Sequence, residues 1–158
     1  MSVLSLFRRH PDRRSSGRRV LVPFTGGELD PVVLAAAIRV AKAEEATLVP
    51  AYLMVIPLEY PLESPLQKQV AAAMPFLEAA ELAGLRAGLE VDARVETGRT
   101  PTHALQRLWS AERFDRIVAP APGFTPKELQ WILVHAPTET LILRPDPAVE
   151  ERALEAVA

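Results

Sequence analysis

Short apolar runs alternate with longer stretches of helical periodicity along most of the chain. Residues 20–22 form a compact apolar run that a proline and two glycines follow, which predicts a buried strand. Asp30 and Pro31 then predict a helix start, with Asp30 as N-cap and the proline at the first helical position. Apolar residues recur at helical spacing from there to residue 41.

The second strand is predicted over residues 47–56, which are rich in apolar and β-branched residues. Pro50 cannot donate a hydrogen bond to a strand ladder, so we expect a bulge or a late strand start there. Residues 57–63 predict a turn-rich loop. Ser64 and Gln67 then fit a capping box that begins a long helix.

Residues 89–96 alternate strictly between apolar and charged side chains. The charged positions are Glu90, Asp92, Arg94 and Glu96. This pattern predicts a strand with one solvated face, at an edge of the sheet.

The last third of the chain predicts two more helix–strand units. Thr100, which a proline follows, predicts the N-cap of a helix, and residues 116–119 predict a strand. Thr125 and Glu128 fit a second capping box and begin a short helix. Residues 140–143 predict the fifth strand.

Strands that alternate with helices imply crossover connections and therefore a parallel sheet. We predict a doubly wound, Rossmann-like α/β fold with five parallel strands and helices on both faces. Ligands of such folds bind beyond the carboxyl ends of the strands. The segments expected there are 25–28, 57–63, 98–102 and 120–125.

Composition favours one cytoplasmic domain. The length of 158 residues fits a single domain, and no apolar run approaches the ~20 residues of a membrane span. The chain has no cysteine, which excludes disulfides, thiolate zinc sites and a cysteine nucleophile and fits a reducing compartment.

Charge is distributed unevenly along the chain. Residues 1–19 hold six arginines and one acid, whereas the whole chain has a net charge of −2. The remainder is therefore net negative, which argues against nucleic acid as a partner. We expect residues 1–17 to be a flexible basic segment, 18–145 to be the domain, and 146–158 to be a tail with a short helix. Residues 1–9 leave open an amphipathic contact with a membrane surface, against a solvated tail.

Candidate catalytic residues are scarce. His103 and His135 have no acidic partners at metal-ligand spacing, and no serine lies in a glycine-flanked elbow. His135 near a helix end is expected to bind the last carbonyl groups. Trp109 and Trp131 fall at apolar helical positions and predict packing, with one of them lining a pocket as the alternative. We predict that the protein is not an enzyme.

Four segments resemble the universal stress protein family. Residues 19–28, which read RVLVPFTGGE, resemble its opening strand, and residues 96–101 are similar to its glycine-x-x-proline turn. Residues 115–118 and 135–145 are similar to its fourth strand and its closing segment. The resemblance covers residues 18–145 and implies the strand order 3-2-1-4-5.

The family's nucleotide-binding pattern is largely absent. Members that bind ATP carry glycine-x-x-glycine, nine residues, then glycine with serine or threonine. Pro120 stands where the first glycine is expected, Gly123 matches the second, and the last pair has no counterpart. Thr25 replaces the aspartate that contacts the nucleotide. Because prolines supply no N–H to a phosphate, we expect no cofactor, and a regulatory or stress-response module that acts without ATP.

The alternative is a nucleotide-binding module that holds ATP or AMP with a rebuilt loop. Its candidate cofactor-binding residues are Thr25, Gly26, Gly27, Tyr52, Gly123 and Thr125. The two adjacent glycines also fit a tight turn that needs positive φ.

The fifth strand predicts a homodimer. The resemblance places it at an edge of the sheet, and dimers of the family commonly pair this strand with its twin. The expected interface residues are Leu141, Ile142 and Leu143. An exposed apolar edge strand would otherwise promote aggregation. A further protein partner stays open.

Overall fold

The five strands form one parallel sheet in the order β3-β2-β1-β4-β5. The computed structural model describes residues 17–64 and 66–144. The strands are β1 (Arg19–Phe24), β2 (Thr47–Val55), β3 (Arg94–Gly98), β4 (Arg116–Pro120) and β5 (Thr140–Leu143). The helices are α2 (Pro31–Ala43), α3 (Gln67–Arg86), α4 (Pro101–Ala111) and α5 (Pro126–His135). The predicted fold class and strand order are confirmed. The predictions for the basic segment before Gly17 and for the tail helix lie outside the described residues.

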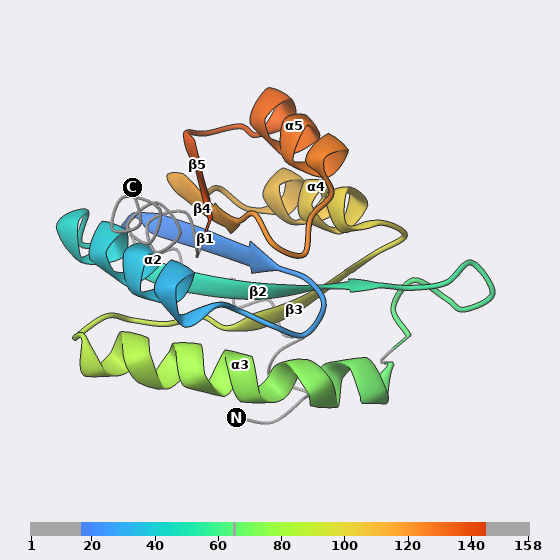
Figure 1. The fold of residues 1–158 in the computed structure, drawn as a ribbon, viewed down its shortest axis with the longest axis horizontal. Coiled ribbons are helices and arrows are strands. Elements are labelled where there is room, and N and C mark those ends of the chain that lie inside the picture. The colour runs from blue at the N-terminus through green and yellow to red at the C-terminus, as the bar shows by residue number, and fades with distance from the viewer. Residues whose placement is uncertain (1–16, 65, 145–158) are drawn as a thin grey trace, which may run out of the picture.

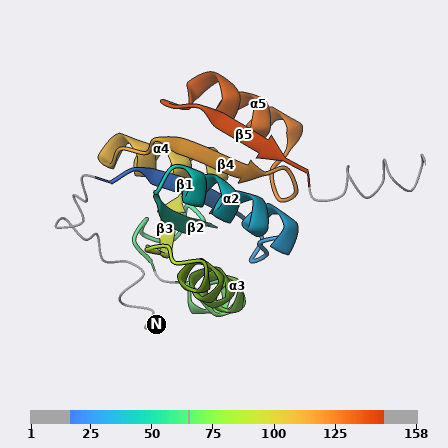
Figure 2. The same cartoon turned by 90° about the vertical axis from the view of Figure 1, so that its left-hand side faces the viewer.

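Helices cover both faces of the sheet. Helices α2 and α3 lie on one face, and α4 and α5 lie on the other (Figures 1 and 2). Val22 and Phe24 of β1 pack into the core under α2 and α3, whereas Leu21 packs into the core under α4 and α5. All three are fully buried, because a central strand is covered on both sides. This explains why residues 20–22 read as a continuous apolar run.

Pro50 causes no bulge, so that expectation is wrong. The register of β2 against β1 runs without interruption along all six residues of β1. Leu48 donates its N–H away from β1, to the carbonyl oxygen of Glu90 at 2.9 Å, so the nitrogen of Pro50 faces the same side. There β2 makes a single bridge with Val91 and regular pairing begins only at Arg94. The missing N–H therefore faces a gap in the ladder.

Three of the four predicted helix N-caps are confirmed, namely Asp30, Thr100 and Thr125. The capping box at Ser64 is wrong. Helix α3 begins at Gln67 with Leu66 as N-cap and has no side-chain cap hydrogen bond. Ser64 instead donates its N–H to the carbonyl oxygen of Pro61 at 3.0 Å, which makes it part of the preceding turn. Among the described residues, no helix is long and apolar enough to cross a bilayer.

Candidate functional site

A small cavity lies at the carboxyl edge of the sheet, where the fold predicts a ligand site. Its volume is about 260 Å³, and it lies between the end of β1, the start of α2 and the loop before α5. Ligand pockets typically measure roughly 300–1,000 Å³, so this cavity is at the small end of the range. The residues that carry its chemistry are Thr25, Gly26, Glu28, Asp30, Pro120 and Gly123.

Thr25 and Gly123 contact each other in the lining of this cavity. The Thr25 hydroxyl donates to the carbonyl oxygen of Gly123 at 2.5 Å, which joins the end of β1 to the loop after β4. Gly123 has φ +93°, and a Cβ there would lie 2.5 Å from the Thr25 hydroxyl oxygen. A glycine is therefore required at this contact. The Thr25 hydroxyl, at the position where the similar family has an aspartate, therefore donates to a carbonyl oxygen within the protein.

Acidic residues and prolines stand out in the lining of this cavity. Glu28 and Asp30 line it, and the carboxylate of Asp30 accepts from the N–H of Val32 at 2.7 Å. Pro120 and Pro122 contribute no N–H. Phosphate sites need free N–H groups and a positive potential, and the acidic residues and prolines of this lining oppose both.

The N-terminus of α5 is also occupied by its own side chains. Thr125 accepts from the N–H of Glu128 at 3.1 Å, and the Glu128 carboxylate accepts from the N–H of Thr125 at 2.8 Å. These N–H groups and the dipole of the helix would otherwise attract an anion. The capping box instead puts a carboxylate at this position.

The structure divides the six candidate cofactor-binding residues into two groups. Those that line the cavity are Thr25, Gly26 and Gly123. Those that do not are Gly27, Tyr52 and Thr125. Gly27 has φ +76° and packs against Ala72 of α3, so it serves the tight turn. Tyr52 is buried beneath α3, with its hydroxyl 3.4 Å from the side-chain oxygen of Gln69, and burial raises the pKa of Tyr52.

Arg99 holds the loop after β2, a contact that the sequence did not indicate. Its guanidinium group donates to the carbonyl oxygens of Pro57 at 2.7 Å and Tyr60 at 2.9 Å. The N–H of Arg99 donates to Nδ1 of His103 at 2.8 Å. His103 therefore has a structural hydrogen bond at the start of α4.

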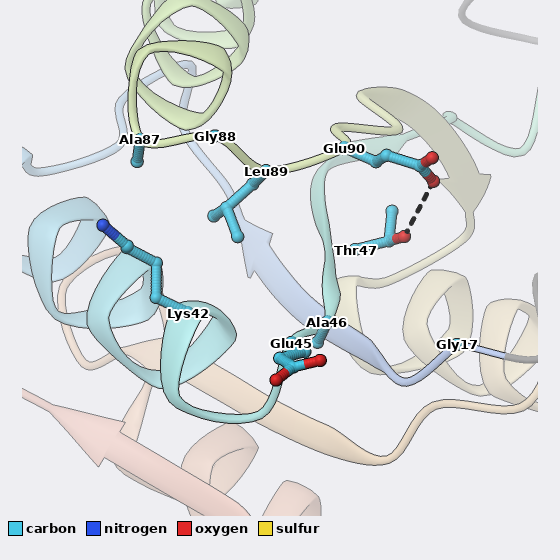
Figure 3. Close-up of a pocket in the computed structure, with 9 residues that line it drawn as sticks. All are labelled: Gly17, Lys42, Glu45, Ala46, Thr47, Ala87, Gly88, Leu89 and Glu90. Carbon is cyan, nitrogen blue, oxygen red and sulfur yellow. Dashed lines mark hydrogen bonds between the residues drawn. The ribbon is translucent and has the colours of Figure 1, made fainter.

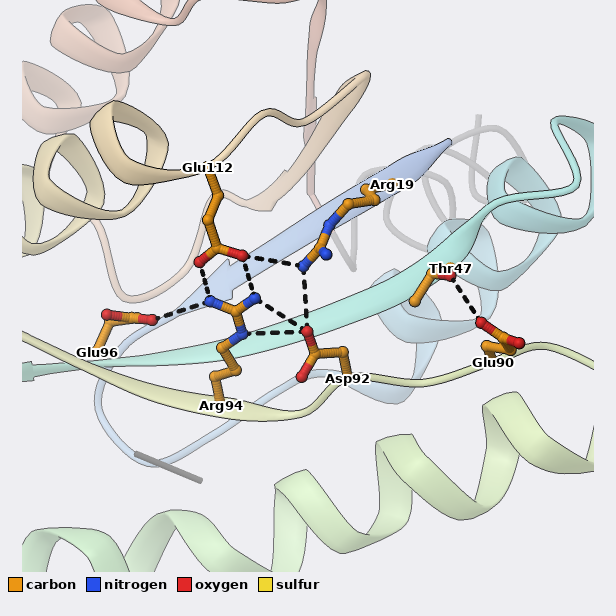
Figure 4. A network of polar contacts seen from close by, with 7 residues as sticks. All are labelled: Arg19, Thr47, Glu90, Asp92, Arg94, Glu96 and Glu112. Carbon is orange, nitrogen blue, oxygen red and sulfur yellow. Dashed lines mark hydrogen bonds and ion pairs between the residues drawn. The ribbon is translucent and has the colours of Figure 1, made fainter. Parts of the chain in front are cut away.

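A buried ionic network lies at the opposite, amino edge of the sheet (Figure 4). The side chain of Arg94 is 2% exposed and donates to Asp92 at 2.9 Å and to both carboxylate oxygens of Glu112. Arg19 lies 3.1 Å from Asp92 and 3.4 Å from Glu112. Glu96 pairs with Arg94 at 3.4 Å. Burial alone lowers the pKa of Arg94, but its hydrogen bonds with Glu112 and Asp92 outweigh this and raise it.

This network corrects the prediction of a solvated face over residues 89–96. The edge position of the strand is confirmed, but β3 begins only at Arg94, and Asp92 and Arg94 are buried. Arg19 from β1 and Glu112 at the end of α4 supply the missing partners. The network lies at the amino ends of the strands, away from the carboxyl-edge cavity, so it is not part of the ligand site that the fold predicts.

Two tryptophans and one histidine form a stack between α4 and α5. The rings of Trp109 and Trp131 stack with centroids 5.5 Å apart, and the His135 ring stacks on Trp131 at 4.6 Å. Nδ1 of His135 lies 2.9 Å from the carbonyl oxygen of Trp131, as expected for a histidine at a helix end. Trp109 also lines a pocket of about 620 Å³, so it both packs between the helices and lines a pocket. No cluster of three or more potential metal ligands occurs in residues 17–64 and 66–144.

Comparison with known proteins shows the fold. No protein-family model and no curated protein matches the chain. A universal stress protein family member from Burkholderia pseudomallei has a TM-score of 0.61 at 22% identity, over 82% of this chain and 97% of that one. UspA from Lactobacillus plantarum has a TM-score of 0.62 at 17% identity, over 80% and 97%. The Archaeoglobus fulgidus universal stress protein in complex with dAMP has a TM-score of 0.63 at 12% identity, over 79% and 96%. The chain therefore has the fold of the universal stress proteins.

Proposed function

We propose that this chain is a divergent universal stress protein that acts as a non-enzymatic regulatory module of the cytoplasm, as a dimer and without ATP. The family assignment is supported by the shared fold together with the order and spacing of the four similar segments. The loss of ATP binding rests on one observation above all. The hydrogen bond between Thr25 and Gly123 occupies the Thr25 hydroxyl at a cavity that Glu28 and Asp30 also line.

Charge and backbone chemistry both oppose a triphosphate in this cavity. A phosphate beside Glu28 and Asp30 would be repelled by each carboxylate, by about 1 kcal/mol at 4 Å in bulk water and by more in partly buried surroundings. In sites that hold phosphates, backbone N–H groups offset such costs. The prolines of this loop cannot supply them.

We expect calorimetric titration of the full chain with ATP to give no binding signal at ligand concentrations up to the millimolar range. Cyclic AMP and AMP should also give no binding signal, because Glu28 and Asp30 repel their phosphate as well. The matched variant is Glu28→Gln, which removes one charge from the lining without changing the length of the side chain. Binding of ATP by the unmodified protein with a micromolar Kd would contradict the proposal.

Binding of a nucleoside monophosphate is the second candidate function. It is favoured by the Archaeoglobus fulgidus neighbour, which is in complex with dAMP. A monophosphate carries less charge past Glu28 and Asp30 than a triphosphate does, and Gly26 leaves an open approach because nothing lies within 4 Å of its Cβ position. Heat released with AMP but not with ATP would favour this function over the first.

The proposed dimer forms by pairing of β5 with its counterpart in a second chain. Strand β5 is an edge strand, and Leu141, Ile142 and Leu143 are only half-buried. The carbonyl oxygens of Glu139 and Leu143 accept from Ile117 and Ala121 on the β4 side. Alternate residues face opposite sides of a strand, so the N–H and carbonyl groups of Ile142 face the open edge. Pairing across this edge would cover backbone that is otherwise an aggregation hazard.

We expect Ile142→Pro to convert the dimer into a monomer, because proline removes the edge N–H and leaves the ladder with β4 intact. Ile142→Ala is the control, since it shortens the side chain but keeps the N–H, and it should still dimerise. Sedimentation velocity at micromolar concentration measures both. A monomeric unmodified protein, or equal dimerisation of the two variants, would contradict pairing through β5.

A further inference from the structure

A second pocket opens at the amino edge of the sheet, away from the carboxyl-edge cavity. Its volume is about 470 Å³, and it lies where α2 and α3 end (Figure 3). Gly17, the first described residue of the chain, lies at one side of it, and Lys42 lies at the other. Between them the pocket is lined by Glu45 and Glu90.

The lining of this pocket near Gly17 is negative. Glu45 and Glu90 are exposed, and neither forms an ion pair with a residue in 17–64 or 66–144. The Thr47 hydroxyl donates to Glu90 at a long 3.5 Å. The C-terminal ends of α2 and α3 add partial negative charge, because the dipoles of both helices point their negative ends here. Lys42 makes the far side of the pocket positive.

The residues that lead into Gly17 carry a matching order of charges. Reading back from Gly17, two serines are followed by Arg14, Arg13 and then Asp12. An extended chain spans at most about 3.3–3.6 Å per residue, so the Cα atom of Arg14 can lie up to about 11 Å from Gly17 and that of Asp12 up to about 18 Å. Along the chain, the two arginines are therefore closer to Gly17, on the acidic side of the pocket, and the aspartate is farther away.

The next two arginines of the chain already pair with acids at this edge. Arg18 lies 3.1 Å from Glu44, and Arg19 lies 3.1 Å from Asp92. Glu44 also binds Arg116, whose hydrogen bond holds the pKa of Glu44 below its usual value. The start of the described chain thus places one arginine after another against carboxylates.

We propose that residues 12–16 bind in this pocket, with Arg13 and Arg14 paired to Glu45 and Glu90 and with Asp12 beside Lys42. The occupant is a segment of the same chain, so it is present at high local concentration and needs little intrinsic affinity. The docked segment would hold its arginines away from other acidic partners, an anionic membrane surface among them.

Limited trypsin digestion of the full chain tests this docking. The measured quantity is the initial rate of cleavage after Arg13 and Arg14, followed by mass spectrometry. The variant E45Q/E90Q removes both charges and keeps the side-chain shapes. Two exposed ion pairs predict a rate about threefold to tenfold higher than that of the unmodified protein. Raising the salt to 0.5 M should accelerate cleavage of the unmodified protein towards the rate of the variant, because salt screens exposed pairs.

The matched control is E59Q/E63Q, which changes net charge equally in the distant loop after β2 and should be cleaved at the rate of the unmodified protein. All rates are normalised to a small peptide substrate, which removes the effect of salt on trypsin. Equal rates for the unmodified protein and E45Q/E90Q would overturn the proposal. So would protection that appears only when phosphatidylserine vesicles are added, because the segment would then bind membrane rather than the pocket.

Discussion

The substitution Arg94→Met is expected to lower the free energy of unfolding by about 3–5 kcal/mol, the usual result of removing one partner from a buried ionic network. Asp92 and Glu112 would then share Arg19 as their remaining cation in the network. Loss of Arg94 should affect Asp92 more than Glu112, because the side chain of Asp92 is only 4% exposed whereas that of Glu112 is 20% exposed. Guanidinium-induced unfolding at pH 7, followed by circular dichroism, measures the loss.

A comparison with an exposed arginine distinguishes loss of the buried network from loss of a surface charge. Arg39→Met is the control, because Arg39 is exposed on α2. An equal loss of stability in the two variants would contradict the ionic explanation.

We expect Gly98→Ala to destabilise the protein by about 3 kcal/mol, at the upper end of the usual cost of overpacking. Gly98 ends β3, and a Cβ there would lie 2.6 Å from the Cα of Ala104 and closer still to its nitrogen. Both are backbone atoms of α4, so a side-chain rotation cannot relieve the contact. The thermal unfolding midpoint and the guanidinium midpoint measure the effect.

A second substitution tests whether backbone contact is the cause. Gly98→Ala with Ala104→Gly removes the Cβ of residue 104 but leaves its nitrogen and Cα in place, so we expect no recovery of stability. Gly26→Ala is a useful comparison, because nothing lies within 4 Å of its Cβ position and only its φ of +71° opposes the change. Full recovery in the double variant would show that α4 lies further from β3.

Local signals in the sequence predicted most of the fold. Asp30, Thr100 and Thr125 indicated helix starts correctly, because an N-cap needs only a side chain and the amide groups two or three residues ahead. Ser64 fits the same pattern but is not an N-cap. A capping box is a pattern of four residues, and here the Ser64 N–H donates to the carbonyl oxygen of Pro61 in the preceding turn.

The charged alternation over residues 89–96 failed for a different reason. Period-two polarity distinguishes the two faces of a strand, but it does not say what covers each face. Arg94 is buried because Arg19 and Glu112, both distant in sequence, lie beside it in the ionic network. The cavity was predictable only in part, because the Thr25 contact with Gly123 joins residues 98 positions apart.

The stacked indole rings give the protein an internal optical probe. The chain has only two tryptophans, Trp109 and Trp131, and their planes lie 7° from parallel. Transitions of rings this close couple, so near-ultraviolet circular dichroism and intrinsic fluorescence will report mainly on the contact between α4 and α5. These signals will follow separation of the two helices without an added label.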